Sequence, residues 1–372
     1  MKIETLRVQG FKSLHGVTWK PGDLNVLIGP NAGGKSNLLS VFDLLGASAR
    51  GDLEKWILAQ GGLLGLLWND ESRELSIELE LPDARLPNLE VRYRLTIEQA
   101  SSIFDFNVRD QIVGLFDSVD TRPSQSHESS HETHLSTLRA QDTHADHQKY
   151  LAGFAANYAI DTSLGSTLRQ PPITSWDLGA VDPLGENLTA VLHTLYTTKP
   201  EFEEDIDRSM RIAFGPEYEK LHFTPAGEQR IQLRIRWKSL SRSRPDLSDG
   251  AWRFLYVLTI LAHPNPPPLI AIDEPETGLH PSMMPIIAEL AADAALRSQV
   301  VLTTHSPEFL DAFRETATPT VTVVENHEGK TQLQTLDQEE LDYWLRAYSL
   351  GKLFRTGKLE NMAEDIRLEA NG

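Results

Sequence analysis

Residues 29–36 read GPNAGGKS and match the pattern G-x-x-x-x-G-K-S. A compact apolar run, residues 24–28, precedes this stretch, and a segment with helical spacing of apolar residues follows it up to a predicted C-cap at Gly46. Glycines let successive backbone N–H groups turn inward around an anion, Lys35 can reach the outer phosphates, and the Ser36 hydroxyl can ligate Mg²⁺. The sequence therefore predicts a nucleotide-binding loop between a strand and a helix. The alternative is an ordinary glycine-rich turn.

A second motif places carboxylates at the end of an apolar run, because residues 269–276 read LIAIDEPE. Ligands of open α/β sheets bind at the carboxyl ends of strands. Asp273 is therefore a candidate ligand of Mg²⁺, and Glu274 is a candidate general base that polarises a water for attack on the γ-phosphate. Acidic pairs after strands are common, so an exposed turn is the alternative. The coexistence with the glycine-rich loop favours the catalytic interpretation.

The motif LSDG at residues 247–250 begins a helix predicted over residues 249–262. Ser248 and the backbone of Gly250 form another candidate anion-binding site at this helix start. Because the loop at residues 29–36 already surrounds the phosphates of one nucleotide, a second phosphate site predicts a second subunit.

Residues 300–305, VVLTTH, form an apolar segment that ends in a histidine. Ser306 and Pro307 follow at once, as is typical of a helix start. A lone histidine is more often a structural residue. Here it ends the strand that follows the carboxylate strand in the sequence, so His305 is a candidate for contact with the γ-phosphate.

Composition excludes several classes of protein. The 372 residues include 53 acidic and 35 basic side chains, a net charge of −18, and no cysteine, which excludes disulfides, thiol nucleophiles and iron–sulfur clusters. The N-terminus lacks the apolar core of a secretory signal, and the longest apolar run, residues 254–262, is too short to cross a bilayer. We therefore expect a cytoplasmic protein without a membrane partner. Any contact with nucleic acid needs a local basic surface.

Strands that alternate with helices predict an α/β fold whose core sheet is largely parallel. The first hundred residues predict a mixed sheet, whereas the next eighty are polar, carry many histidines and show no sustained core pattern. We expect an N-terminal lobe, an inserted and partly flexible subdomain, a C-terminal lobe and a tail at residues 1–100, 101–183, 184–360 and 361–372.

Five motifs in this order resemble the ABC-type ATPases of the RecF, SMC and OLD group, especially its stand-alone ATPases that are sometimes classified as AAA-type. They are FKSL (11–14), GPNAGGKSN (29–37), LSDG (247–250), IDEPETGLHP (272–281) and TTHSP (303–307). The resemblance extends to residues 185–195 and 348–360, and so covers most of the chain except the insert. It implies a P-loop NTPase with an ABC ATPase head, in which two chains enclose two ATP molecules head to tail.

The resemblance also implies a role for each matching residue. Asp273 and Ser36 would hold Mg²⁺, Glu274 would be the catalytic base, and His305 would be the switch histidine. Ser248 and Gly250 would act in trans. The nucleotide would be surrounded by Lys12, Asn31, Gly33, Gly34, Lys35, Ser36 and Asn37, with Lys35 also catalytic. The alternative interpretation of Lys12 is an ordinary solvated lysine in a turn.

The sequence departs from the wider group in four respects. The signature reads LSDG rather than LSGG, and no glutamine that links Mg²⁺ to a helical lobe can be identified. There is no heptad pattern for a long coiled coil, and no D-x-D follows His305 for a Toprim nuclease.

Two weaker patterns remain open. Five histidines within 21 residues are a candidate Zn²⁺ or Ni²⁺ site or a solvated loop: His127, His131, His134, His144 and His147. A basic strand face is a candidate track for DNA or RNA or an ordinary exposed face: Arg230, Arg234, Arg236 and Lys238, continued by Arg242 and Arg244.

These observations predict a Mg²⁺-dependent ATPase whose ATP-bound homodimer is a conformational switch. The resemblance points to DNA repair or anti-phage defence, with nucleic acid or a separate effector protein under control. The alternative is an ATP-gated scaffold for a partner protein. The motor of a membrane transporter is disfavoured because the motifs point to the RecF side.

Overall fold

The computed structural model describes residues 1–69, 72–82, 89–100, 105–116, 119–120, 125–129, 131–142, 144–157, 161–163, 165–170, 179–227, 230–239, 247–313 and 317–371. The chain forms two compact units. Unit 1 comprises Met1–Ala156, Pro319–Tyr348 and Leu353–Gly372. Unit 2 comprises Asn157–Thr318 and Ser349–Lys352.

Unit 1 contains an antiparallel sheet with strand order β2-β1-β4-β5-β6-β7, in which β8 also pairs with β6. In β4, leucines and isoleucine alternate with polar residues and are fully buried, whereas the other face of the sheet carries Arg7 paired with Glu78 and Glu80. The strands are β1 (Thr5–Phe11), β2 (Leu14–Trp19), β4 (Glu74–Pro82), β5 (Leu89–Gln99), β6 (Phe106–Phe116), β7 (Val119–Asp120) and β8 (Gln125–Ser129).

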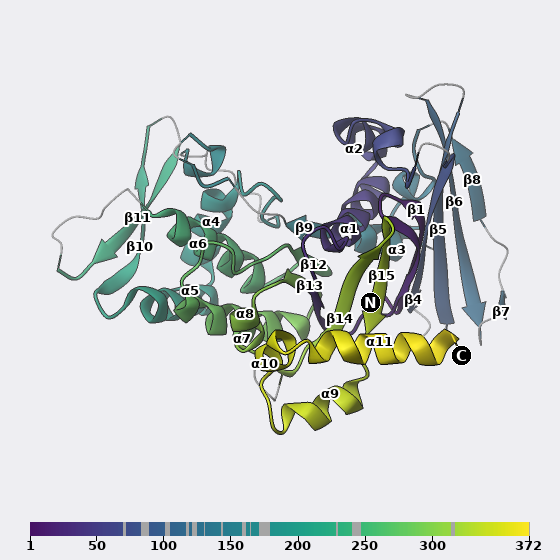
Figure 1. Cartoon of the computed structure of the whole chain (residues 1–372). Helices are drawn as coiled ribbons and strands as arrows, with labels where there is room; N and C mark the ends of the chain where they lie inside the picture. The colour runs from purple at the N-terminus through teal and green to yellow at the C-terminus, as the bar shows by residue number, and fades with distance from the viewer. Residues whose placement is uncertain are drawn as a thin grey trace. The chain divides into compact units, whose positions relative to one another are not determined.

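A second group of strands in unit 1 carries the glycine-rich loop. Strand β3 (Leu24–Ile28) is buried throughout and runs parallel to β14 (Thr320–His327), which pairs antiparallel with β15 (Lys330–Thr335). Helix α1 (Lys35–Arg50) follows the loop, and α11 (Lys358–Asn371) packs along β14 and β15 (Figure 1). The smaller elements are α2 (Leu53–Ala59), η1 (Leu63–Gly65), η2 (Leu135–Thr137), α3 (Ala145–Ala152) and α9 (Gln338–Leu345). Two further elements, β9 (Ala155–Asn157) and α10 (Leu350–Arg355), include residues assigned to both units.

Unit 2 is built around two buried parallel strands, β12 (Leu269–Ile272) and β13 (Gln299–Thr304). Its helix α6 (Asp249–Leu261) packs against α7 (Met284–Ala295), and β10 (Tyr218–Pro225) pairs antiparallel with β11 (Ile231–Trp237). The remaining elements are η3 (Thr167–Arg169), α4 (Leu188–Thr198), α5 (Pro200–Phe214), η4 (Pro281–Met283) and α8 (Pro307–Leu310).

Most of the predicted elements are present. Strand β12 has the predicted bounds, and the Ser306 hydroxyl accepts a hydrogen bond from Phe309 N at the start of α8. The prediction that the first helix ends at Gly46 is wrong, because α1 continues to Arg50. Gly46 is instead a point of close approach: a Cβ there would lie 3.2 Å from the Phe154 carbonyl oxygen.

Residues 101–183, predicted as an inserted helical or irregular subdomain, contain the strands β6 and β8 as well as the helix α3. The domain boundaries predicted at residues 100, 183 and 360 stay predictions. In the described part of the chain, no helix has both the length and the apolar character needed to cross a membrane.

Candidate functional site

The glycine-rich loop of unit 1 has the backbone of an anion-binding loop. Gly34 lies at φ +112° and is the residue immediately before α1, and Ala32 lies at φ +64°. The Lys35 side chain is only 5% exposed, and its ammonium donates to the carbonyl oxygens of Gly29 (2.8 Å) and Pro30 (3.0 Å). The loop therefore holds a buried cation at the start of a helix, where phosphate oxygens are favoured.

The loop glycines are needed because β14 and β15 pack directly on them. A Cβ on Gly29 would lie 2.1 Å from the Val324 carbonyl oxygen, and one on Gly34 would lie 2.0 Å from the Thr331 hydroxyl. Thr331 also donates to the Gly33 carbonyl oxygen at 3.0 Å. The hairpin of β14 and β15 thus forms the back wall of the loop.

The FKSL turn lies beside the same loop. Asn37 Nδ2 donates to the Ser13 hydroxyl (2.7 Å), and this hydroxyl lies 2.6 Å from that of Thr331. Lys12 lies at φ +47° with its amine 3.4 Å from the hydroxyl of Ser40, one turn along α1 from Ser36. Burial lowers the pKa of the Lys12 amine, while the charge of a nearby aspartate opposes this shift. The loop residues Asn31 and Ser36 are exposed.

Unit 2 contains the carboxylate turn, and Thr303 fixes its geometry. The parallel register of β12 and β13 pairs Ile272 with Leu302, which places Asp273 beside Thr303. The fully buried Thr303 hydroxyl donates to Asp273 Oδ1 and accepts from Glu274 N at 3.0 Å. Glu274 lies at φ +46°, a conformation that costs about 1–3 kcal/mol for a residue with a side chain. One hydroxyl therefore stabilises a strained turn.

Both carboxylate oxygens of Glu274 have protein partners. Oε1 lies 2.9 Å from His305 Nδ1, and Oε2 accepts from the Thr277 hydroxyl at 3.2 Å. Glu276 is 5% exposed and accepts a hydrogen bond from Thr304, and burial raises the pKa of its carboxyl to about 7. Thr303, Thr304 and His305, at and just after the end of β13, thus contact the three acidic residues of the turn, Asp273, Glu276 and Glu274.

The signature motif begins α6 in unit 2. Ser248 is exposed, and its hydroxyl accepts a hydrogen bond from Ala251 N at 3.2 Å. A Cβ on Gly250 would lie 3.4 Å from the Gly278 carbonyl oxygen, so Gly250 is close to the segment that follows the carboxylate turn. The hydroxyl proton of Ser248 and the first amides of α6 are available to an anion.

The structure brings together Asp273, Glu274 and His305, and, in the other unit, Lys12, Lys35 and Asn37. Asn37 contacts Ser13, although the resemblance predicts that it lies at the phosphates. Three residues of the carboxylate turn and its strand were not predicted from the sequence: Glu276, Thr303 and Thr304. The pairing of neighbouring parallel strands was the signal that could have identified the two threonines. The donors Asp273 and Ser36 are hard oxygen ligands and suit Mg²⁺.

Three of the five candidate metal histidines make ring contacts within unit 1. The rings of His144 and His147 are buried and meet edge to face at 5.6 Å, and the His131 ring packs against Phe106. No group of three or more His, Cys, Asp or Glu among the described residues could hold a metal ion. The side chain of His127 lies outside the described part of the chain.

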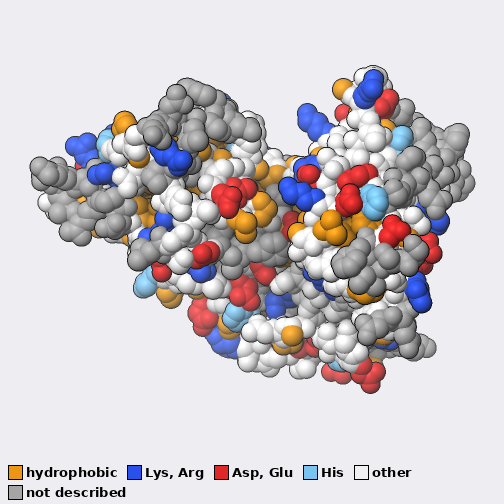
Figure 2. Space-filling model, turned by 90° about the horizontal axis from the view of Figure 1, so that it is seen from above, with side chains coloured by type: hydrophobic (Ala, Val, Ile, Leu, Met, Phe, Trp, Pro, Cys, Tyr) orange, Lys and Arg blue, Asp and Glu red, His pale blue; other side chains and the backbone are white. Residues whose placement is uncertain are grey.

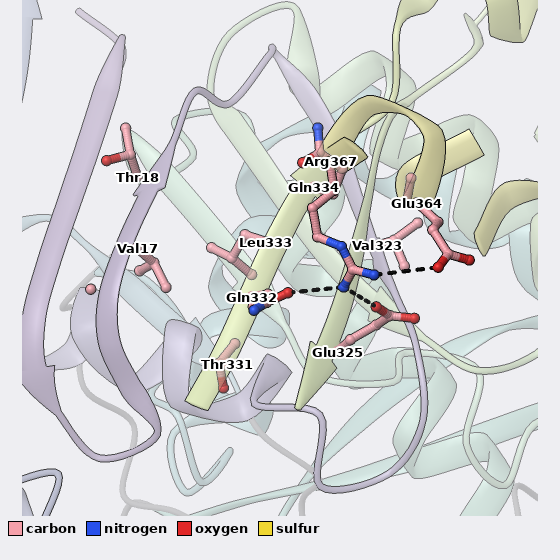
Figure 3. Close-up of a pocket in the computed structure, with 12 residues that line it drawn as sticks. Val17, Thr18, Val323, Glu325, Thr331, Gln332, Leu333, Gln334, Glu364 and Arg367 are labelled. Carbon is pink, nitrogen blue, oxygen red and sulfur yellow. Dashed lines mark hydrogen bonds and ion pairs between the residues drawn. The ribbon is translucent and has the colours of Figure 1, made fainter. Parts of the chain in front are cut away.

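A pocket of about 260 Å³ in unit 1 lies between β2, β14, β15 and α11, and its lining includes Thr331 from the back wall of the glycine-rich loop (Figure 3). Arg367 of α11 reaches across it and contacts Gln332 (3.2 Å), Glu325 (4.0 Å) and Glu364 (3.5 Å). These contacts attach α11 to the hairpin, so the pocket walls have a structural role.

The phosphate loop, the serine-capped helix and the carboxylate–histidine turn define an ABC-type P-loop ATPase with the fold of an SMC head. The family model AAA_21, “AAA domain, putative AbiEii toxin, Type IV TA system”, matches residues 24–157 and 185–311. This is more than half of the chain, and the chain belongs to this family.

Solved structures agree on the fold. One, an Smc head bound to the C-winged helix domain of ScpA, has 12% identity and a TM-score of 0.59 over 92% of this chain and 99% of that chain. Another, the Smc head of Pyrococcus furiosus with an extended coiled coil, bound to the C-terminal domain of ScpA, has 12% identity and a TM-score of 0.57 over 93% and 98%. A comparison with the curated proteins finds no match.

Proposed function

We propose that the protein binds and hydrolyses Mg²⁺-ATP and that two chains close around two nucleotides. The observation that carries this proposal is that one chain has both a phosphate loop, in which Lys35 is buried, and a separate exposed helix start at Ser248. One nucleotide does not need both sites from one chain. Two chains arranged head to tail use every site once.

The proposal gives each side chain of the carboxylate turn a role in metal binding or catalysis. Asp273, oriented by Thr303, and Ser36 would each be a ligand of Mg²⁺. Glu274 accepts the proton of the attacking water, and His305 holds the Glu274 carboxylate from one side and contacts the γ-phosphate from the other. Lys35 leaves its carbonyl partners for the phosphates, whose full charges bind an ammonium more strongly than carbonyl dipoles do.

The test is Glu274→Gln, which keeps the shape and the hydrogen bond of the side chain but removes the base. We expect turnover to fall at least about 100-fold, because general-base catalysis contributes that much or more. We also expect an ATP-bound dimer to accumulate, measured by light scattering after size exclusion. Glu217→Gln is the matched control, since Glu217 is exposed on unit 2. Unchanged turnover in Glu274→Gln would refute the assignment.

The switch is proposed to act in anti-phage defence or DNA repair. The family description names a toxin of a type IV TA system, which supports a defence role. The related Smc heads are bound to domains of ScpA, which supports the second candidate, an ATP-gated scaffold that holds a partner protein. Neither role needs an intrinsic nuclease.

A basic face on β10 and β11 favours control of nucleic acid. The strand pairing adds Lys220 opposite Arg236 and His222 opposite Arg234. Successive side chains on one face lie about 6.7 Å apart, close to the spacing of phosphates along a strand. Glu219 neutralises part of the face through Arg236 (3.2 Å). On the face displayed in Figure 2, Lys and Arg side chains of the described residues lie in several separate groups.

Charge reversal separates the two roles. Arg234→Glu with Arg236→Glu should abolish stimulation of the ATPase by single-stranded DNA or RNA and leave the unstimulated rate unchanged. Lys55→Glu with Lys149→Glu, two exposed residues of unit 1, is the control. No stimulation of the parent protein by nucleic acid favours the scaffold, whereas stimulation that survives the first pair shows that this face is not the nucleic-acid site. Arg242 and Arg244, which continue the predicted strip, lie outside the described residues.

A further inference from the structure

Arg169, in η3 of the predicted insert, contacts the signature motif directly. Its Nη1 donates to the Leu247 carbonyl oxygen at 3.0 Å, and its Nη2 forms an ion pair with Asp249 Oδ1. Its Nε donates to the Thr162 carbonyl oxygen at 2.8 Å. The guanidinium therefore bridges the residues on both sides of Ser248, and its side chain is only 13% exposed.

The segment that carries Arg169 lies close to α6, the helix that begins at the signature motif. Leu168 is 2% exposed, and a Cβ on Gly185 would lie 2.7 Å from its side chain and 3.3 Å from the Tyr256 ring of α6. The Tyr256 hydroxyl donates to the Pro183 carbonyl oxygen at 2.9 Å. Arg169 therefore contacts the signature from a segment fixed on α6.

We propose that Arg169 is a positioning residue for the signature: it holds the backbone around Ser248 in the conformation that presents the serine hydroxyl and the Gly250 amide to the nucleotide of a second subunit. This role rests on the proposed ATP-bound dimer. It accounts for the aspartate of LSDG, because a glycine at position 249 offers no carboxylate to Arg169.

The chemistry favours arginine over lysine at this position. The Nε, Nη1 and Nη2 atoms of the planar guanidinium donate to two carbonyl oxygens and one carboxylate at the same time. The single ammonium of a lysine cannot donate to all three with the same geometry. Asp249 is 69% exposed, so the ion pair alone contributes little, and the bond to the buried Leu247 carbonyl contributes more. The effects of substitution should therefore increase in the order Asp249→Asn, Arg169→Lys, Arg169→Ala.

The experiment uses the full chain with Glu274→Gln, in which the closed dimer accumulates. ATP-dependent dimerisation is measured by analytical ultracentrifugation, and binding of a fluorescent ATP analogue by the dilute monomer is measured in parallel. We expect Arg169→Ala to raise the dimer dissociation constant about tenfold or more and to leave the affinity of the monomer within about twofold, because the phosphate loop lies in unit 1. Arg208→Ala is the control, since Arg208 is exposed on α5.

A mixed dimer tests action in trans, which a purely structural role would not show. When Lys35→Ala chains are mixed with Arg169→Ala chains, one composite site combines an intact loop with an intact signature. This mixture should form more dimer than either variant alone. The heterodimer of the double variant with the parent chain has no intact site. When the two chains carry different fluorophores, this heterodimer should form less than the heterodimer of the first mixture, measured in the same way.

The outcomes separate the two proposals. Dimerisation of Arg169→Ala equal to that of the parent overturns the positioning role and leaves the ATP-dependent dimer in place. A parent that does not dimerise with ATP overturns both. If Arg169→Ala fails to fold, Arg169→Lys and Asp249→Asn decide: the expected result is a graded loss of dimer, and no loss overturns the role.

Discussion

Replacing Thr303 by valine is the sharpest probe of the carboxylate turn. Valine has nearly the shape of threonine and lacks the hydroxyl. In the fully buried site of Thr303, that hydroxyl donates to Asp273 and accepts from the Glu274 amide. The substitution therefore leaves the packing intact and removes two hydrogen bonds that hold Asp273 and Glu274.

The expected magnitude follows from these bonds. A hydrogen bond to a carboxylate contributes about 1.5–3 kcal/mol, and a buried N–H left without a partner costs about 1–3 kcal/mol. Asp273 is only half-buried and can turn toward water, so the first value lies at its lower end. We expect a loss of about 3 kcal/mol in the free energy of unfolding of this unit. Glu274 is then free to leave its strained conformation, and kcat should fall about 100-fold.

Urea unfolding followed by tryptophan fluorescence measures the stability, and phosphate release measures kcat. Thr259→Val is the control, because the buried Thr259 hydroxyl donates back to the Leu255 carbonyl oxygen of its own helix, at 2.6 Å. Its loss should cost less than about 1 kcal/mol. If Thr303→Val matches this control in stability and keeps kcat within about twofold, the argument from the hydroxyl is wrong.

Three further predictions concern the loop, the buried acid and the metal. Gly29→Ala should lower the free energy of unfolding by about 3 kcal/mol or more and abolish ATP binding, because its Cβ would meet the Val324 carbonyl oxygen. Gly61→Ala is the control, because Gly61 lies at φ +89° in open space, and it should lower the free energy of unfolding by about 1 kcal/mol. Glu276 has a folded pKa of about 7, above the value of 4.5 expected when unfolded, so it should lower stability as pH rises from 4.5 to 7, by roughly 3 kcal/mol in total. Glu276→Gln should remove this dependence in denaturant midpoints measured from pH 5 to 8, and identical profiles of the two proteins would contradict the assignment. Removal of Mg²⁺ with EDTA should abolish phosphate release and only weaken ATP binding, and turnover in EDTA would count against the metal site.

Spacing along the chain predicted the phosphate loop and the strands that carry chemistry. The conformation of the loop depends on local backbone geometry, so the eight residues 29–36 are enough to predict the positions of Gly34 and Lys35 in it. The apolar run before Asp273 is short, continuous and bounded by polar turns, and the strand has the predicted bounds. The serine at position 306 caps its helix as its neighbours indicate.

Contacts between distant segments could not be predicted in this way. Gly46 resembles a helix end, and only the proximity of the Phe154 backbone shows that it is a packing position. Thr303 acquires its role from the register between two strands about thirty residues apart. Nothing in the sequence around Arg169 predicts its contact with the signature, because Leu247 and Asp249 lie about eighty residues away.

The back wall of the phosphate loop has a consequence for biosynthesis. Thr331 contacts Gly33 across 298 positions of the chain, and Val324 lies against Gly29. A ribosome therefore translates the loop, the signature and the histidine strand long before the hairpin that supports the loop exists. A nascent chain stopped before residue 320 carries all five motifs and, under the proposed function, should still be unable to retain ATP, because the hairpin of β14 and β15 has not yet been translated.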